Sequence, residues 1–158
     1  MKTLNALQRI FTANLLTTGR QWRRVVDLTL SSYGLSEAAA APLLWIGRLG
    51  GGVRQVVLAT HVGIEGPSLV RLLDQLESMD LVTRKDDPTD RRAKGLWLTA
   101  EGEVLASRME DALDALRGNI LANVEQADIE AAIRVLKAFE DFEAPKAAGA
   151  AEEREKVS

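Results

Sequence analysis

The first third of the chain has the apolar spacing of helices. Over residues 4–30, large apolar side chains recur close to the helical period. This spacing predicts one long helix or two shorter ones, closed near Gly34. Ser36 can cap a second helix that runs to about Leu49, and the glycines at 50–52 then predict a loop.

The middle of the chain carries the clearest amphipathic pattern. A short helix over residues 53–62, stopped by Gly63, precedes the segment GIEGPSLVRLLDQLESMD. Five apolar residues in that segment recur at helical spacing and predict the core face of a helix: Leu69, Leu72, Leu73, Leu76 and Met79. The opposite face presents Pro67, Arg71, Asp74 and Ser78, flanked by Ser68 and Gln75.

A β-hairpin is predicted next. The segments LVTRK and GLWLT have the length and composition of short strands, and DPTDRRAK between them has the residues of a turn. Such a turn would place three cations at one tip: Arg91, Arg92 and Lys94.

The last third of the chain predicts two more amphipathic helices, over roughly residues 100–124 and from Ile129 to Phe139. Both carry many acidic residues on the face opposite the apolar stripe. Residues 144–158 have no apolar side chains that could form a core, so we predict a disordered tail there.

Composition narrows the possible chemistry. The 158 residues are 46% hydrophobic, which suits one domain. Cysteine is absent and His61, predicted to be a helix-end residue, is the only histidine, so thiol chemistry and a transition-metal site are not expected. No plausible nucleophile or acid–base pair stands out, and we predict neither enzymatic activity nor a cofactor. No segment approaches the length of an apolar membrane span, so we expect a cytoplasmic protein.

Charge is unevenly distributed along the chain. The net charge is -3 and the isoelectric point is about 5.3. Residues 1–34 carry five Lys/Arg and one acid, residues 53–94 carry seven of each sign, and residues 95–158 carry seven Lys/Arg and fourteen acids. A polyanion would therefore bind a local surface, with the acidic C-terminal part facing elsewhere.

The order of the middle elements is typical of a winged helix-turn-helix. The major groove of DNA admits one helix, and a basic hairpin beside that helix can reach phosphates or the minor groove. Arg71, the only cation in the middle of the predicted reading helix, is our candidate for a base contact. The balanced charge of residues 53–94 leaves one alternative open, a winged-helix protein-interaction module without DNA binding.

The segment HVGIEGPSLVRLLDQLESMDLVTRKDDPTDRRAKGLWLTAEG resembles the DNA-binding core of the MarR family of bacterial transcription regulators, and specifically its SlyA-like branch. The earlier QWRRVVD and GLS also fit, so the resemblance covers roughly residues 15–140. It implies a mainly α winged helix-turn-helix protein with one domain over residues 1–143. Within that domain it implies dimerisation helices at 1–34 and 100–143, a DNA-binding lobe at 53–99, and a homodimer that reads a palindromic site.

The resemblance also assigns DNA contacts. It implies that the reading helix brings four residues to the major groove: Pro67, Ser68, Arg71 and Gln75. In the wing it implies Arg92 in the minor groove, with Arg91 and Lys94 closer to phosphate. Asp74 and Asp90 would then orient arginines by charge-assisted hydrogen bonds.

Many relatives release DNA when a small aromatic acid binds between the dimerisation helices and the reading lobe. The matching positions in this chain are Arg20, Trp22, Arg23, Ala40, Leu44 and Trp45. An arginine could pair with a carboxylate while Trp45 or Leu44 covers a ring; alternatively, the tryptophans are core residues and the arginines are solvated or face DNA. We expect a repressor that a small aromatic carboxylate or phenolic ligand releases from its operator.

Overall fold

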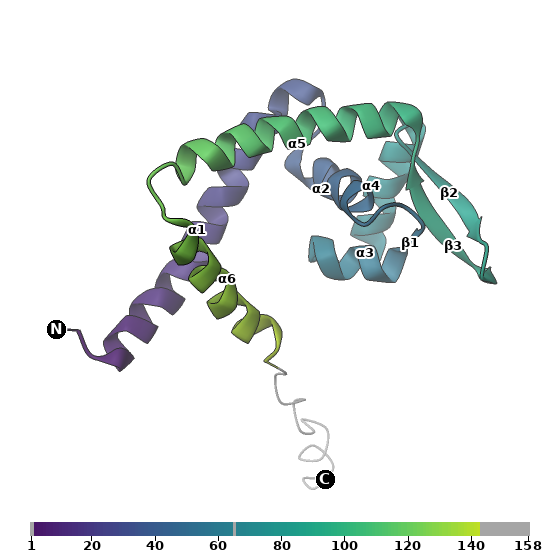
Figure 1. Cartoon of the computed structure of the whole chain (residues 1–158). Coiled ribbons are helices and arrows are strands. Elements are labelled where there is room, and N and C mark those ends of the chain that lie inside the picture. Colours follow the sequence, from purple (N-terminus) through teal and green to yellow (C-terminus); the bar gives the residue numbers. More distant parts are fainter. Residues whose placement is uncertain (1, 65, 143–158) are drawn as a thin grey trace, which may run out of the picture. The chain divides into compact units, whose positions relative to one another are not determined.

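The computed structural model describes residues 2–64 and 66–142, and the tail predicted over residues 144–158 lies outside this range. The chain is mainly helical with a small antiparallel sheet, as expected for a winged helix protein (Figure 1). The elements are α1 (Leu4–Leu30), a 3-10 turn (Ser31–Tyr33), α2 (Glu37–Arg48), β1 (Val53–Arg54), α3 (Gln55–Val62), α4 (Gly66–Ser78), β2 (Val82–Asp87), β3 (Asp90–Leu98), α5 (Ala100–Ile120) and α6 (Gln126–Glu140).

The chain divides into two compact units, residues 1–119 and residues 120–158. The first unit contains the sheet and helices α1 to α4, with nearly all of α5. The second unit contributes α6, whose described side chains include none that is buried. Helices α3 and α4 and the hairpin therefore belong to the same compact unit.

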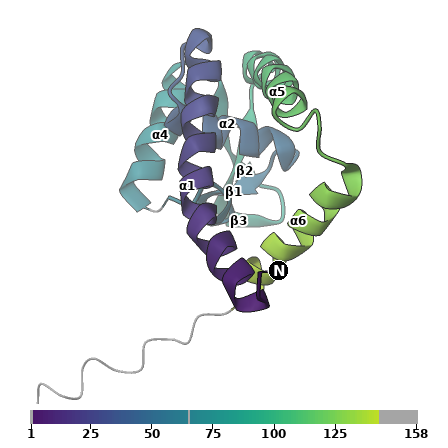
Figure 2. The ribbon, with the colours of Figure 1, turned by 90° about the vertical axis from the view of Figure 1, so that its left-hand side faces the viewer.

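The two N-terminal helices have the ends that their sequence predicts. Helix α1 is a single uninterrupted helix (Figure 2), and Thr3 caps it by accepting a hydrogen bond from the Ala6 N–H. Ser36 caps α2 as expected, because its hydroxyl accepts from the Ala39 N–H at 3.3 Å. Asp27 of α1 accepts a further hydrogen bond from the Glu37 N–H at 3.1 Å. The two caps satisfy backbone donors that a helix start otherwise leaves free.

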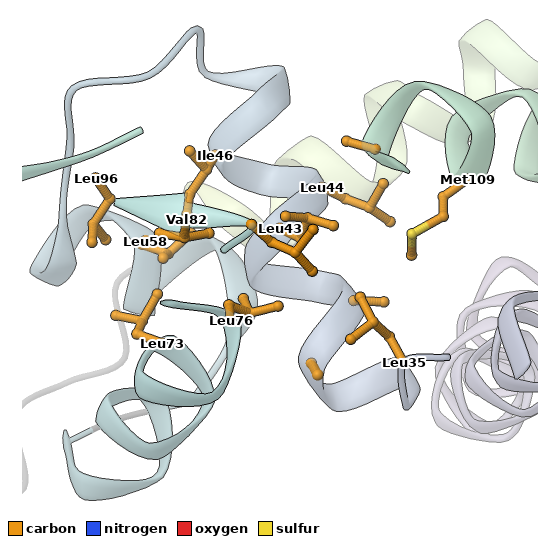
Figure 3. Packing of buried hydrophobic residues seen from close by; sticks show 14 of the residues in the cluster. Leu35, Leu43, Leu44, Ile46, Leu58, Leu73, Leu76, Val82, Leu96 and Met109 are labelled. Atoms are coloured by element: carbon orange, nitrogen blue, oxygen red, sulfur yellow. The ribbon is translucent and has the colours of Figure 1, made fainter. Parts of the chain in front are cut away.

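Helix α2 is the centre of the core in the first unit. Its Leu43 and Ile46 are fully buried, and the helix packs against α3, α4 and β3. Figure 3 shows these side chains together with those from the neighbouring elements: Leu58, Leu73, Leu76, Val82 and Leu96. Burial of this apolar cluster holds the reading helix and the sheet on one scaffold.

The sheet has the strand order β1-β3-β2, with all pairs antiparallel. Its hairpin extends further than predicted, since β2 and β3 continue through most of the segment assigned to a turn, leaving Pro88 and Thr89 as the connection. Residues 53 and 54, predicted as the start of a helix, instead pair with Leu96 and Gly95 of β3. These strand ends were missed because cross-strand partners, not local sequence, determine them.

A tight junction joins the sheet to α5. Thr99 donates its hydroxyl to the Asp80 carbonyl at 2.6 Å and accepts from the Gly102 N–H at 3.0 Å. A Cβ added at Gly102 would lie 2.0 Å from the Leu81 carbonyl oxygen, so only glycine fits. The start of α5 is therefore fixed against the end of α4 and the start of β2.

Within the described residues, no single helix has the length and apolar character of a membrane span. Helices α3 and α4 have that length and apolar character only when they are taken together, and their axes differ by 103°.

Candidate nucleic-acid interface

Helices α3 and α4 form a helix-turn-helix. Their axes differ by 103°, which is within the usual range for this motif. Helix α3 ends at Gly63, whose φ of 73° is the left-handed conformation that glycine adopts without strain. The predicted stop of α3 at Gly63 is thus confirmed.

Helix α4 separates an apolar face from a polar one. Leu69, Leu73 and Leu76 are completely buried and Leu72 is half-buried, as predicted. Met79 was predicted as core but is 43% exposed, because α4 ends at Ser78 and the chain leaves the helical path. The face opposite the leucines is exposed and includes all four predicted major-groove residues: Pro67, Ser68, Arg71 and Gln75.

The three cations of the wing lie on strand β3 and not on a turn, which corrects the sequence prediction. All three are exposed. Because side chains alternate along a strand, Arg92 and Lys94 share one face while Arg91 lies on the other. Lys94 pairs across the hairpin with Asp86 at 3.3 Å. In the described part of the chain, neither Arg92 nor Arg91 makes an ion pair.

The acids Asp74 and Asp90 do contact arginines, but these are arginines that the sequence did not single out. Asp74 accepts a hydrogen bond from Arg84 of β2 at 2.7 Å, and Glu77 also binds Arg84. Asp90 lies 3.7 Å from Arg54 of β1. Arg84 thus connects the wing to the reading helix. Its partners could not be recognised from local sequence, since they lie on a different element.

A second set of bonds fixes the wing turn. Asp87 accepts from the Thr89 hydroxyl at 2.6 Å and the Thr89 N–H at 2.8 Å, and Arg54 donates to the same carboxylate at 3.2 Å. The two hydrogen bonds from Thr89 are the main cause that lowers the pKa of Asp87 from 3.8 to about 2, and Arg54 contributes less. The nearby Asp90 accepts from the backbone N–H of Arg92 at 3.0 Å.

A cavity of about 160 Å³ lies between α1, α2 and α5. We call it the effector cavity after the ligand site that the sequence predicts, because it is lined by five of the six predicted ligand residues: Trp22, Arg23, Ala40, Leu44 and Trp45. The sixth, Arg20, does not line it and bonds to Thr17 on α1 instead. Ala40 and Leu44 are buried, whereas Trp22 is 37% exposed and is not a core residue.

Two arginines that sequence reasoning missed also line the effector cavity. Arg48 binds Glu110 at 2.5 Å and lies 5.0 Å from the centre of the Trp45 ring. Arg117 binds Glu110 at 3.4 Å and Asp114 at 2.5 Å. Glu110 and Asp114 thus compensate two of the three arginines that line the cavity, and the third, Arg23, makes no ion pair within the described residues.

His61 is the last helical residue but one in α3, as predicted for a helix-end residue, and its ring stacks on Trp45 at 4.6 Å between centroids. This contact links α3 of the helix-turn-helix to the wall of the effector cavity.

Comparisons with known proteins agree with this architecture. The MarR family profile matches residues 33–93. The structure of the transcriptional regulator PA3341 is 37% identical, with a TM-score of 0.75 over 84% of this chain and 99% of that one. CouR from Rhodococcus jostii RHA1, solved with p-coumaroyl-CoA, is 26% identical, with a TM-score of 0.78 over 89% and 99%. NadR, solved with 4-hydroxyphenylacetate, shares the fold at 22% identity, with a TM-score of 0.76 over 84% and 94%. The chain belongs to the MarR family of transcription regulators.

Proposed function

We propose that the protein is a cytoplasmic, dimeric repressor of the SlyA-like branch that binds a palindromic DNA operator. The observation that carries this proposal is the exposed polar face of α4 beside a strand with three exposed cations. One helix fits the major groove and a basic hairpin reaches the adjoining backbone.

In this proposal α4 enters the major groove. Arg71 makes no ion pair within the described residues, so its guanidinium is available to bond the O6 and N7 atoms of a guanine. Pro67, Ser68 and Gln75 lie on the same exposed face and contact neighbouring bases or phosphates. Asp74 lies beside them and holds Arg84, which fixes the wing relative to the reading helix.

The wing supplies the second set of contacts. Arg92 enters the minor groove, where negative potential attracts an arginine. Arg91 and Lys94 contact phosphates. The Lys94–Asp86 pair does not prevent this, because both side chains are more than 60% exposed and an exposed ion pair contributes little.

A dimer is supported by apolar side chains that stay exposed within each unit. On α1 these are Leu4, Leu7 and Ile10, and on α6 they are Ile133, Val135 and Leu136. Exposed apolar surface of this extent on helices marks an interaction site. A symmetric dimer would place two reading helices on half-sites about one helical turn of DNA apart.

The effector cavity supports release by a small aromatic carboxylate or phenolic compound. Its volume of about 160 Å³ is close to that of a cavity that takes one benzene ring. Arg23 lines the cavity and makes no ion pair within the described residues, so its guanidinium can bind an anionic group. Trp45 and Leu44 supply apolar walls. CouR, a similar protein, binds p-coumaroyl-CoA.

The test is DNA selection followed by a salt titration. The protein is used to select fragments from its own genome, and the affinity for the best fragment is measured by fluorescence anisotropy at several salt concentrations. A regulator that neutralises several phosphates loses affinity steeply as salt rises. Failure to enrich any fragment, with no salt dependence, would favour the alternative, a winged-helix protein-interaction module.

A further inference from the structure

Two acids flank the turn at the tip of the wing, Asp87 at the end of β2 and Asp90 at the start of β3. Both pair with the same cation, Arg54, at 3.2 Å from Asp87 and 3.7 Å from Asp90. Arg54 belongs to β1, outside the hairpin, and no function was predicted for it from the sequence. A single arginine therefore compensates both carboxylates.

The two carboxylates divide their oxygens in the same way. Oδ1 of Asp87 accepts both bonds from Thr89, and Oδ1 of Asp90 accepts from the Arg92 N–H at 3.0 Å. The second oxygen of each acid, Oδ2, is the one that pairs with Arg54. The bonds that shape the turn thus leave one oxygen of each acid for Arg54 to compensate.

The Arg54 side chain reaches these acids across the sheet. In the strand order β1-β3-β2, Arg54 lies opposite Gly95 of the middle strand, whereas Asp87 belongs to the outer strand β2. Gly95 has no side chain that could obstruct the path from Arg54 to Asp87. The pairing with Arg54 therefore depends on the assembled sheet, in which β1 pairs with β3 through residues 53 and 54.

This arrangement keeps the arginines at the tip unpaired. Residues 91–93 of β3 have no described partner on β2, because the register of the hairpin shifts beside them. Arg91 and Arg92 lie in this stretch, are exposed, and make no ion pair within the described residues. Asp90 is next to them in sequence, so without Arg54 its carboxylate would attract these two arginines.

We propose that Arg54 is a positioning residue for DNA binding, which neutralises Asp87 and Asp90 so that Arg91 and Arg92 stay available to the DNA. This inference rests on the proposed function, in which the wing contacts DNA. Uncompensated carboxylates at the tip would repel phosphates, because like charges that face each other oppose association. Arg54 acts through the two acids and does not itself contact the DNA.

The test measures affinity for the selected operator fragment by fluorescence anisotropy. Arg54→Met removes the charge and should weaken binding about threefold to tenfold at about 0.1 M salt, and less at higher salt, which screens exposed charges. Arg54→Lys keeps the charge and should restore most of the affinity. Arg108→Met is the control, because it removes the same charge from α5, where Arg108 lies over the Tyr33 ring. It should change the affinity by less than about twofold.

A second background separates compensation of the acids from a direct contact with DNA. In a protein with both Asp87→Asn and Asp90→Asn, each amide keeps an oxygen that can accept from Thr89 or Arg92 but carries no charge. Arg54→Met should then have little effect on affinity. An equal loss in this background and in the wild type would show that Arg54 contacts phosphate itself, which would overturn the proposal.

Amide hydrogen exchange in the free protein tests whether Arg54 instead holds the shape of the turn. The Arg92 amide should exchange in Arg54→Met as it does in the wild type, because Asp90 still accepts its hydrogen bond. Much faster exchange, with no rescue of DNA affinity by Arg54→Lys, would overturn the proposal in favour of a structural role. If the wild type and Arg54→Met bind the operator equally, this inference alone fails. If the wild type selects no DNA, the proposed function fails and this inference fails with it.

Discussion

Position 102 requires glycine because a neighbouring backbone leaves no space for a side chain, and not because the backbone needs the conformational freedom of glycine. In an exposed helix, replacing glycine with alanine usually adds up to about 1 kcal/mol of stability. At Gly102 the new Cβ would meet the Leu81 carbonyl at 2.0 Å, so α5 would have to move. We expect Gly102→Ala to lower the free energy of unfolding by about 1–3 kcal/mol, the range for overpacking.

Urea denaturation at one protein concentration measures this effect. Gly118→Ala is the matched control, because Gly118 is on the same helix and a Cβ there meets nothing within 4 Å. It should be neutral or slightly stabilising. Equal effects at the two positions would show that the junction between Leu81 and α5 tolerates a side chain.

Arg71 is the residue on which specificity depends in the proposed complex. Arg71→Ala should cost about 1–3 kcal/mol of DNA-binding free energy and relax the preference at one base pair. Lys94→Ala, the comparison variant, should weaken all sequences alike and reduce the salt dependence. Binding to a library of single-base operator variants separates the two. An unchanged base preference in Arg71→Ala would show that another face of α4 reads the DNA.

At the scale of residues, the sequence predicted the buried leucines of α4 well, because their spacing alone places them on one face. It did not predict that Arg84 binds Asp74 or that Arg54 binds Asp87. Their acidic partners lie 10 and 33 residues away, and no periodic pattern connects positions on different elements.

In the proposed complex, position along strand β3 decides which part of the DNA each arginine of the wing contacts. Arg92 and its neighbour Arg91 carry the same charge but lie on opposite faces of β3. We expect Arg92→Ala to weaken binding most at operators with A/T-rich flanks, whose minor groove is narrow. Arg91→Ala, the control, should weaken A/T-rich and G/C-rich flanks equally. If Arg92→Ala lost equal affinity for operators with A/T-rich and G/C-rich flanks, Arg92 would contact phosphate only.

The turn of the wing contains a carboxylate that should stay ionised in mild acid. The pKa of Asp87 is lowered from 3.8 to about 2 by its hydrogen bonds to Thr89. Because the folded-state pKa is the lower one, the stabilisation is fully present above pH 3.8 and is lost as the pH falls through about 2. Thr89→Ala should raise the pKa of Asp87 toward its ordinary value, whereas Thr89→Ser keeps the hydroxyl and the low pKa.

Carboxyl-carbon NMR titration measures this pKa directly. If Asp87 titrated alike in wild type and in Thr89→Ala, the turn would be held by Arg54 and not by Thr89.

Among the elements, the long helices were predictable and the strand ends were not. Helix α4 has an apolar stripe, and α2 has Ser36 as its cap. By contrast β1 has only two residues, Val53 and Arg54, which is too few for any alternation. The charged ends of β2 and β3 look like a turn in sequence, and only their cross-strand partners, such as Lys94 and Asp86, make them strands.

For the whole molecule, the exposed apolar residues of α6 predict association. Ile133→Asp should shift the equilibrium between dimer and monomer by about 100-fold or more toward monomer, because an unpaired charge would be buried at the interface. Sedimentation velocity over a range of concentrations measures this shift. Arg134→Asp is a stricter control, since it changes the charge by more but lies on the polar side of α6. A dimer unaffected by Ile133→Asp would exclude this face.

The family could be recognised from sequence because motifs such as DRRAK and GPSLVRLLDQLE are local. The cavity could not. The effector cavity combines α1, α2 and α5, whose residues are up to 95 positions apart, from Trp22 to Arg117, and no local sequence pattern indicates that such distant residues line one cavity. The predicted ligand residues came from the family resemblance, and five of the six line the cavity. That Arg48 and Arg117 also line it could be recognised only from the assembled helices.

The strand order β1-β3-β2 leaves β2 as an outer strand with one row of backbone N–H and C=O groups unpaired by the sheet. An unpaired edge strand of this kind can form hydrogen bonds with a strand from another molecule. Here it carries Arg84, Lys85 and Asp86 in succession, and an added strand would have to desolvate these charges. The charges of β2 therefore disfavour edge-to-edge pairing of the sheet with another molecule.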